Sequence, residues 1–218
     1  MKKIPVKTRI LTQKDDIIKT ICKYAGDQIG PDDIVTVAES VLAITQGRMK
    51  RPEEMTPSLV AKVLCRFFPQ KGSISNWASM QALVEEEGTM RVLTAFIVGS
   101  LGKIVGKSGL FYQLVGEQGK LIDDMTGTVP PFDKHIVYGP KDASVVADSI
   151  RIATGCYGAA IVDANDLKKV AIVGMSSGIN PDMLTELLLD NPFGNDNQKT
   201  PIVIIKNYSR YENNNEVV

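Results

Sequence analysis

Short apolar runs rich in β-branched residues are the feature that most constrains how this chain folds. The clearest run, IVTVA at residues 34–38, is continuous, which is typical of a strand buried on both faces. Further runs occupy residues 158–163, 169–175 and 201–207, and helical patterns lie among them. Strands that alternate with helices indicate an α/β fold. We therefore expect an α/β protein with some α+β character and a βαβ-like core in its C-terminal half.

Helical patterns account for most of the remaining chain. They are expected over residues 17–27, 58–68, 76–87, 90–105, 143–154 and 181–190. Thr56, followed by Pro57, is the expected N-cap of the second helix, and Ser75 that of the third. The apolar helix at 90–105 is expected to be buried in the core. Residues 110–140 consist of short apolar runs separated by turns, which favours β structure.

The domain organisation follows from these elements. No Pro-, Gly- or Ser-rich linker divides the chain, so we expect one domain over residues 1–208. The helical region at 56–105 forms a possible lobe, inserted into the sheet or packed beside it. The polar residues 209–218 are expected to be a flexible tail.

Charge and cysteine content exclude several classes of protein. Lys plus Arg and Asp plus Glu number 25 each, so the chain lacks the broad positive charge of a nucleic-acid-binding protein. No apolar run approaches the roughly 20 residues of a membrane helix. The three cysteines lie far apart without a C-x-x-C motif, and Cys22 and Cys65 fall in apolar helical patterns where burial is expected. We expect a cytoplasmic protein that acts on a small molecule, without membrane or nucleic-acid partners.

Acidic residues follow two apolar segments. Asp123 and Asp124 end one segment, and Asp163, Asn165 and Asp166 end another. Ligands of α/β folds usually bind where strands end, and carboxylate and amide oxygens suit Mg²⁺ or Mn²⁺. Asp and Asn also form turns after strands, so each group alone has a structural explanation.

Other polar segments have two possible roles. The backbone N–H groups of Thr126–Thr128 could meet an anion, or this segment could be a rigid turn. The segment 174–178 lies between a strand and a helix, where it could hold a phosphate, but a tight turn is favoured. His135 is the only histidine, and a structural role is favoured. The acidic run Glu85–Glu87 is typical of a solvated helix face, although acids are unfavourable at a helix C-terminus.

The order of these segments resembles the coenzyme F420-0:L-glutamate ligase family from Val6 to Lys206. The resemblance is carried by VKTRIL, DDIVTVAESVLAITQGR, ALVEEEGTMRVL, GAAIVDAND, VAIVGMSSGI and TPIVIIK. It implies that family's mixed sheet and helical lobe in an intertwined homodimer. It also implies a GTP- and metal-dependent ligase, using Mn²⁺ or Mg²⁺, which forms an acyl phosphate that the amino group of glutamate then attacks.

The resemblance assigns roles by position, but it singles out no catalytic acid, base or nucleophile. Asp163 matches the family's metal-binding Asp, Asp123 or Asp124 stands at the second metal position, and Asp166 lies nearby. The positions that would face the nucleotide are Lys7, Thr8, Arg9, Glu39 and Ser40. The positions of a substrate or phosphate loop are Thr126, Gly127, Thr128 and Asn165.

Three departures from the family pattern bear on nucleotide binding. Ser40 and Ile44 stand where the family has lysines that neutralise phosphate charge, and Ala164 replaces a hydroxyl residue. Weak or absent ligase activity is therefore expected unless other cations compensate. One alternative is a non-catalytic relative that keeps the fold and dimer but has lost GTP binding. Another is a metal-dependent hydrolase or transferase on the same scaffold. The apolar segment 90–105 is a second reason to expect a homodimer.

Overall fold

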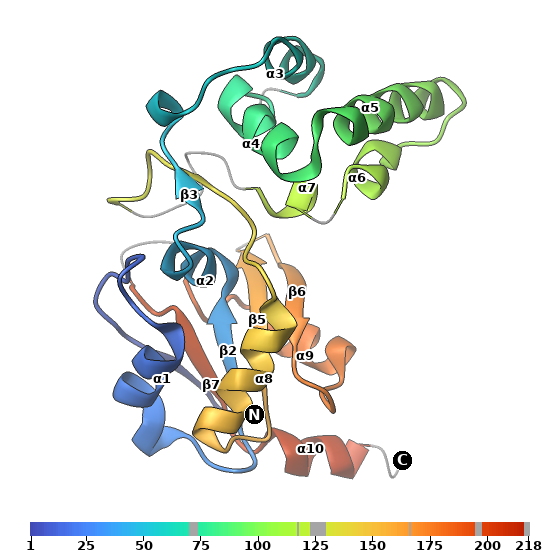
Figure 1. Ribbon diagram of the computed structural model, residues 1–218. Coiled ribbons are helices and arrows are strands. Elements are labelled where there is room, and N and C mark those ends of the chain that lie inside the picture. Colours follow the sequence, from blue (N-terminus) through green and yellow to red (C-terminus); the bar gives the residue numbers. More distant parts are fainter. Residues whose placement is uncertain (70–73, 117, 123–129, 166, 195–197, 216–218) are drawn as a thin grey trace. The chain divides into compact units, whose positions relative to one another are not determined.

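The chain forms two compact units in a computed structural model (Figure 1). The structure describes residues 1–69, 74–116, 118–122, 130–165, 167–194 and 198–215. Unit 1 comprises Met1–Gly47 and Pro140–Val218, and unit 2 comprises Arg48–Gly139. Unit 2 contains the predicted helical region at 56–105. Each unit has apolar cores of its own.

Unit 1 is built on a five-stranded mixed sheet, which confirms the predicted α/β fold class. The strands lie in the order β1 (Lys3–Val6), β7 (Ile202–Ile205), β2 (Ile34–Ala38), β5 (Gly158–Asn165) and β6 (Lys169–Met175). β2 and β5 are parallel, and every other neighbouring pair is antiparallel. β2, β5, β6 and β7 coincide with the β-branched runs of the sequence.

The register brings three carboxyl ends of strands to one edge of this sheet. Val6 of β1 and Val37 of β2 both pair with Ile202, which begins β7 between them. Ala38, at the end of β2, pairs with Val162 of β5. The loops that leave β1, β2 and β5 therefore start from the same sheet edge.

Helices cover both faces of the sheet because its strands are apolar on both sides. Figure 1 shows α1 (Ile17–Ala25) and α8 (Ala143–Thr154) on one face, where they pack against alternate residues of β2 and β5. The other face packs against α9 (Pro181–Leu188) and α10 (Tyr208–Asn215). α2 (Glu39–Thr45) follows β2 directly, and a short 3-10 helix, η1 (Gly26–Gln28), follows α1.

Unit 2 is mainly helical. Its core gathers apolar side chains from four of its helices. In chain order its elements are β3 (Met49–Lys50), η2 (Pro52–Glu54), α3 (Leu59–Leu64), η3 (Cys65–Phe67), α4 (Trp77–Glu87), α5 (Thr89–Ile104), α6 (Leu110–Leu114), α7 (Gln118–Leu121) and β4 (Ile136–Val137). β3 and β4 form a two-stranded antiparallel sheet. Within the described part of the chain, no helix combines the length and apolarity needed to cross a bilayer.

Two predicted helix caps in unit 2 are displaced by one or two residues. The N-cap of α3 is Ser58, whose Oγ accepts from the N–H of Ala61 at 3.1 Å, and not Thr56. The N-cap of α4 is Asn76, whose Oδ1 accepts from the N–H of Ser79 at 2.8 Å, and not Ser75. In both cases the cap is the residue whose oxygen reaches the third amide of the helix.

The expectation of β structure after Gly109 is wrong for residues 110–114 and 118–121, which form α6 and α7. Short apolar runs do not distinguish a strand from a buried helix. Here tertiary packing decides: Phe111 of α6 is buried and makes an edge contact with Phe68, with 4.7 Å between ring centroids. Only the two residues of β4 are strand in the described part of this region.

Two burial expectations and the expected flexible tail also differ from the structure. α5 is not enclosed, since its buried residues are Val92, Ala95 and Gly102 while much of its other side is exposed. Cys22 is exposed, whereas Cys65 and Cys156 are buried. Residues 209–218, predicted as a flexible tail, include most of α10, where buried Glu212 accepts from the hydroxyl of Tyr157 at 2.9 Å.

Close packing of α8 on β6 depends on Gly174, and it generates our first prediction. A Cβ at Gly174 would lie 2.5 Å from backbone atoms of Ala143 and Ser144, which cannot move without shifting α8. Gly174→Ala should destabilise unit 1 by about 1–3 kcal/mol. Urea unfolding followed by circular dichroism measures this loss. Gly26→Ala is the matched control, because a Cβ there meets no atom within 4 Å, and an equal loss in both variants would contradict the packing explanation.

Candidate functional site

Loops from three strands meet at the carboxyl edge of the unit 1 sheet. The segment before β7 joins two of them: the N–H of Thr8 donates to Lys199 O at 2.8 Å, and the N–H of Ala38 donates to Pro201 O at 2.9 Å. This edge therefore carries Lys7–Arg9 after β1, Glu39–Ser40 after β2, and Asp163–Asn165 at the end of β5. The structure brings these predicted site residues to one edge.

Asp163 has the properties of a cation ligand. It pairs with Ala171 of β6 in the sheet, and its side chain is exposed. Although solvent reaches it, neighbouring atoms displace enough water that desolvation raises the pKa of Asp163. Among the described residues, no hydrogen bond or ion pair engages this carboxylate. A partly desolvated carboxylate without a cationic partner fits a hard divalent cation.

The other predicted metal ligands, Asp123, Asp124 and Asp166, lie outside the described residues. The same holds for the loop Thr126–Thr128. Within the described ranges, no cluster of three or more His, Cys, Asp or Glu side chains is placed to hold a metal ion. A metal site shared between two acidic loops therefore stays a prediction, with Asp163 as the member whose position is known.

Asn165 has the turn-forming role that was its alternative. Its Oδ1 accepts from the N–H groups of Leu167 at 3.0 Å and Lys169 at 3.3 Å, and Lys168 has a positive φ of 57°. The side chain thus closes the β5–β6 turn. The substrate-loop role assigned by resemblance is not needed to explain this residue.

The two predicted nucleotide positions of α2 differ in accessibility. Glu39 is 4% exposed, whereas Ser40 is partly buried. Ile44, at the second missing lysine, is also buried. Of these three side chains, Ser40 is therefore the one best able to meet a ligand at the sheet edge.

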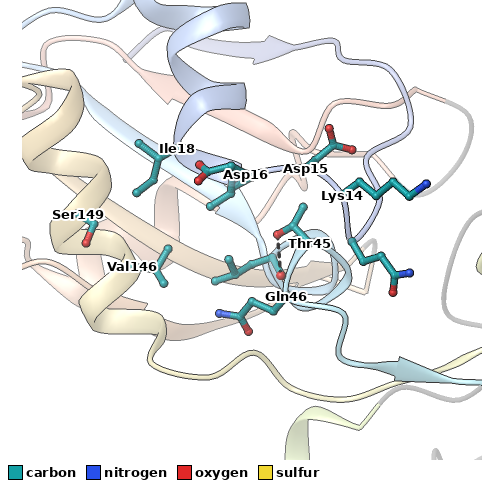
Figure 2. Close-up of a pocket in the computed structure, with 11 residues that line it drawn as sticks. Lys14, Asp15, Asp16, Ile18, Thr45, Gln46, Val146 and Ser149 are labelled. Atoms are coloured by element: carbon teal, nitrogen blue, oxygen red, sulfur yellow. Dashed lines mark hydrogen bonds between the residues drawn. The ribbon is translucent and has the colours of Figure 1, made fainter.

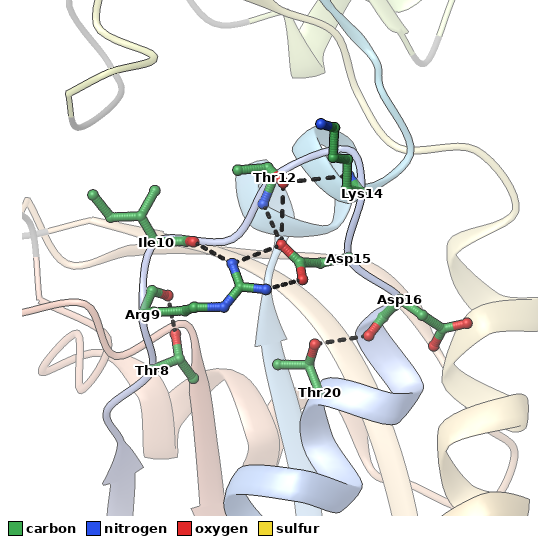
Figure 3. A network of polar contacts seen from close by, with 8 residues as sticks. All are labelled: Thr8, Arg9, Ile10, Thr12, Lys14, Asp15, Asp16 and Thr20. Carbon is green, nitrogen blue, oxygen red and sulfur yellow. Dashed lines mark hydrogen bonds and ion pairs between the residues drawn. The ribbon is translucent and has the colours of Figure 1, made fainter.

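The loop after β1 holds itself together through an ion pair (Figure 3). The guanidinium of Arg9 donates to both carboxylate oxygens of Asp15, with Nη1–Oδ2 at 3.1 Å, and to Ile10 O at 3.0 Å. Asp15 also accepts from the N–H of Thr12 at 2.8 Å. Arg9 thus already neutralises a carboxylate. Lys7 and Lys14 are exposed cations of this loop that no described acid holds, and Lys7 is the one that directly follows β1.

A surface groove of about 340 Å³ lies beside this loop (Figure 2). It opens between the start of α1, the end of α2 and the first half of α8. Gln46 shapes one wall, because its amide donates to Lys141 O at 2.9 Å and accepts from Lys141 N at 2.8 Å. The groove is lined by Gln13, Lys14, Asp15, Asp16, Ile17, Ile18, Leu42, Thr45, Gln46, Val146 and Ser149. No local sequence pattern predicts this groove, since the loop before α1 and three separate helices contribute its lining.

The segment 174–178 does not belong to the candidate edge. Met175 pairs with Ala160, so β6 ends at the opposite edge of the sheet from Asp163. Ser176 is buried, and its Oγ accepts from the N–H of Ala159 at 3.0 Å. The tight-turn alternative accounts for these residues, and a phosphate loop shared with Asp163 does not.

Two features of unit 2 have structural explanations. The Nε2 of His135 accepts from the Nε of Arg51 at 3.2 Å, and its ring meets Phe132 edge-on. The acidic run at the end of α4 is not a purely solvated face, because each carboxylate has a cationic partner that offsets the helix dipole. The pairs are Glu85–Lys50 at 2.8 Å, Glu86–Arg48 at 2.8 Å and Glu87–Arg91 at 2.9 Å.

Comparison with known proteins adds one finding. A family model described as F420-0:gamma-glutamyl ligase matches residues 5–179, most of the chain. The match includes the end of β1, all of β2, β5 and β6, and all of unit 2. No curated protein matches the chain.

The Asp15 ion pair generates our second prediction. Burial acts to raise the pKa of Asp15, but the Thr12 amide and the Arg9 guanidinium outweigh it and hold this pKa below its usual value. A depressed carboxyl pKa stabilises the fold above the unfolded value of about 3.9, and the contribution is lost as pH falls through the folded pKa. Asp15→Asn should cost about 1 kcal/mol at pH 7.

Urea unfolding of the unmodified chain and of Asp15→Asn, at pH 7 and near pH 3, measures how the lost stability depends on pH. The loss should shrink at the lower pH, because the pKa of Asp15 is lowered in the native protein and the unfolded chain therefore binds the proton first as the pH falls. Asp27→Asn, at an exposed aspartate of η1, is the control and should show little loss at either pH. A loss from Asp15→Asn that is equal at both pH values would rule out the charge of Asp15 as its cause.

Proposed function

We propose, because this chain belongs to the F420-0:gamma-glutamyl ligase family, that it is an enzyme that joins the carboxylate of an F420-0-type substrate to the amino group of glutamate. The family match over residues 5–179 is the observation that carries this proposal. The sheet edge supports it, because Lys7 after β1, Ser40 after β2 and Asp163 near the end of β5 lie at one edge of the sheet and inside the matched region.

The proposed reaction needs charge neutralisation more than it needs an acid or base. A carboxylate oxygen of the substrate would attack the γ-phosphorus of GTP, whose charge Mn²⁺ or Mg²⁺ would offset; the bond to the β-phosphate breaks, and an acyl phosphate and GDP result. The neutral amine of glutamate would then attack the acyl carbon, and the amide forms as phosphate leaves and the nitrogen loses a proton. In this proposal Asp163 holds the cation, and Lys7 faces the phosphates. Arg9 can bind the phosphates only if its ion pair with Asp15 breaks.

Supply of positive charge is the weak point of the site. A triphosphate brings several negative charges beside Asp163, and phosphoryl-transfer sites usually offset them with metal ions and basic side chains. Ser40 and Ile44 supply none, and Arg9 is already paired with Asp15. This observation favours a second candidate function, a relative that keeps the fold but does not bind GTP.

Metal binding at Asp163 is our third prediction. If Asp163 holds Mn²⁺, then Mn²⁺ at about 100 times its Kd should stabilise the protein by about 2.7 kcal/mol. Asp163→Asn should remove most of this stabilisation, because a neutral amide is a poorer cation ligand. Thermal unfolding with and without MnCl₂ measures the effect. Asp182→Asn, at an exposed aspartate of α9, should keep the full response, and a wild-type response in Asp163→Asn would place the metal elsewhere.

Restoring one lysine is our fourth prediction. Ser40→Lys should raise GTP affinity at least about tenfold, or roughly 1.4 kcal/mol, by returning a cation to the phosphate site. Ile44→Lys is not a useful partner variant, since Ile44 is buried and an unpaired ammonium there would destabilise the fold. Ser177→Lys is the charge-matched control, because this exposed residue follows β6 at the opposite sheet edge. Calorimetric titration with GTP and Mn²⁺ compares the GTP affinity of the unmodified chain, Ser40→Lys and Ser177→Lys.

The same proteins decide between the two candidate functions. Each is incubated with F420-0, glutamate, GTP and Mn²⁺, and the glutamylated product is sought by mass. We expect weak turnover from the unmodified chain and faster turnover from Ser40→Lys. Robust turnover without the added lysine would show that the missing cations are dispensable. Absence of product from both proteins, together with absence of GTP binding, would support the non-catalytic candidate.

A further inference from the structure

The groove beside α1 is a cavity that the proposed reaction does not use. Its volume of about 340 Å³ lies at the lower end of the range for small-molecule sites (Figure 2). Part of its lining is apolar: Ile17 and Leu42 are buried, and Ile18 and Val146 pack against the same core while they stay partly exposed. These side chains can cover the apolar body of a small ligand.

The two hydroxyl groups that line the groove already donate their protons to the backbone. Thr45 Oγ1 donates to Leu42 O at 2.9 Å. Ser149 Oγ donates to Val145 O at 2.8 Å. A hydroxyl has one proton and two lone pairs, so both oxygens can still accept a hydrogen bond. Toward a ligand, these hydroxyl groups therefore act as acceptors.

Asp16 supplies the negative charge of the groove. Its Oδ1 accepts from the N–H of Lys19 at 2.9 Å as the N-cap of α1, and its carboxylate forms no ion pair with any described residue. In Figure 2 this carboxylate points toward α8, whereas the side chain of Lys14 extends away from it. The neighbouring Asp15 is already held by Arg9. Asp16 is thus the lining carboxylate whose charge can meet a ligand.

These features select one class of ligand. An anion would be repelled by Asp16, and Mg²⁺ or Mn²⁺ would need more oxygen ligands than one carboxylate and two hydroxyl groups supply. A primary ammonium carries one positive charge and three N–H donors, which suit this carboxylate and these hydroxyl acceptors. The amides of Gln13 and Gln46 both donate and accept, so they favour no ligand class.

We propose that this groove binds a primary ammonium group on a short apolar chain, with Asp16 as its counter-ion. Two sources supply this chemistry: a simple aliphatic amine, and the amino group of an amino acid such as the glutamate of the proposed reaction. The aliphatic amine fits the groove better, since the carboxylates of glutamate would be repelled by Asp16. The proposal rests on the groove and not on ligase activity, so a chain that fails to bind GTP would leave it unchanged.

NMR titration of the full chain with pentylammonium chloride at pH 7 tests the site. We expect saturable shifts of the backbone amide signals of residues 13–18, 45–46 and 146–149. Asp16→Asn should weaken binding at least about tenfold because it removes the charge, while asparagine keeps the N-cap of α1. Asp27→Asn removes the same charge from η1, beyond the other end of α1, and should keep the affinity. Unchanged binding in Asp16→Asn, or no saturable shift in the unmodified chain, overturns the proposal.

Two further ligands separate charge from apolar contact and distinguish the two sources. 1-Pentanol has the same carbon chain without the charge, so it should bind at least about tenfold more weakly than pentylammonium. Equal affinity would make the groove an apolar surface only and overturn the proposal. Glutamate shifts at the same residues, lost in Asp16→Asn, would support the ammonium site and assign it to the amino-acid substrate. Binding of pentylammonium without binding of glutamate would support the aliphatic amine.

Discussion

Strand β7 hydrogen-bonds to β1 on one side and β2 on the other, and the candidate edge takes its geometry from this double pairing. Ile202 lies opposite both Val6 and Val37, so the ends of β1 and β2 are held one strand apart. The parallel pairing of β2 with β5 extends the same edge to Asp163. Without β7, Lys7 would have no fixed position relative to Ser40 and Asp163. The chemistry proposed for this edge therefore rests on backbone pairing made by β7.

The strands of unit 1 could be predicted because their signal is local. Continuous β-branched residues suit a strand that is buried on both faces, and β2 and β5 lie where that pattern occurs. α6 and α7 could not be predicted in the same way, since their short apolar runs become helical only through packing such as that of Phe111 on Phe68. The pairing of Glu86 with Arg48 was equally hidden, because the partners lie far apart in sequence.

The candidate site was predictable in part. Asp163 could be identified because it follows an apolar strand, and the topology places it with the loops after β1 and β2. Sequence reasoning did not reveal that Arg9 is held by Asp15 or that Ile44 is enclosed. Both facts depend on side-chain direction, which no local pattern specifies for a loop or a helix end. They matter because they decide which groups remain to meet a phosphate.

The position of β7 also has a consequence for how the protein forms on the ribosome. Unit 2 is one continuous segment, so all of its residues have emerged once Gly139 leaves the exit tunnel. Unit 1 is discontinuous, and β1 and β2 both pair with β7, a strand that is translated only after all of unit 2. Nascent domains generally fold as units once their residues are available. Unit 2 is thus expected to fold before β7 is available, while the edge that carries Asp163 is completed only when β7 has emerged.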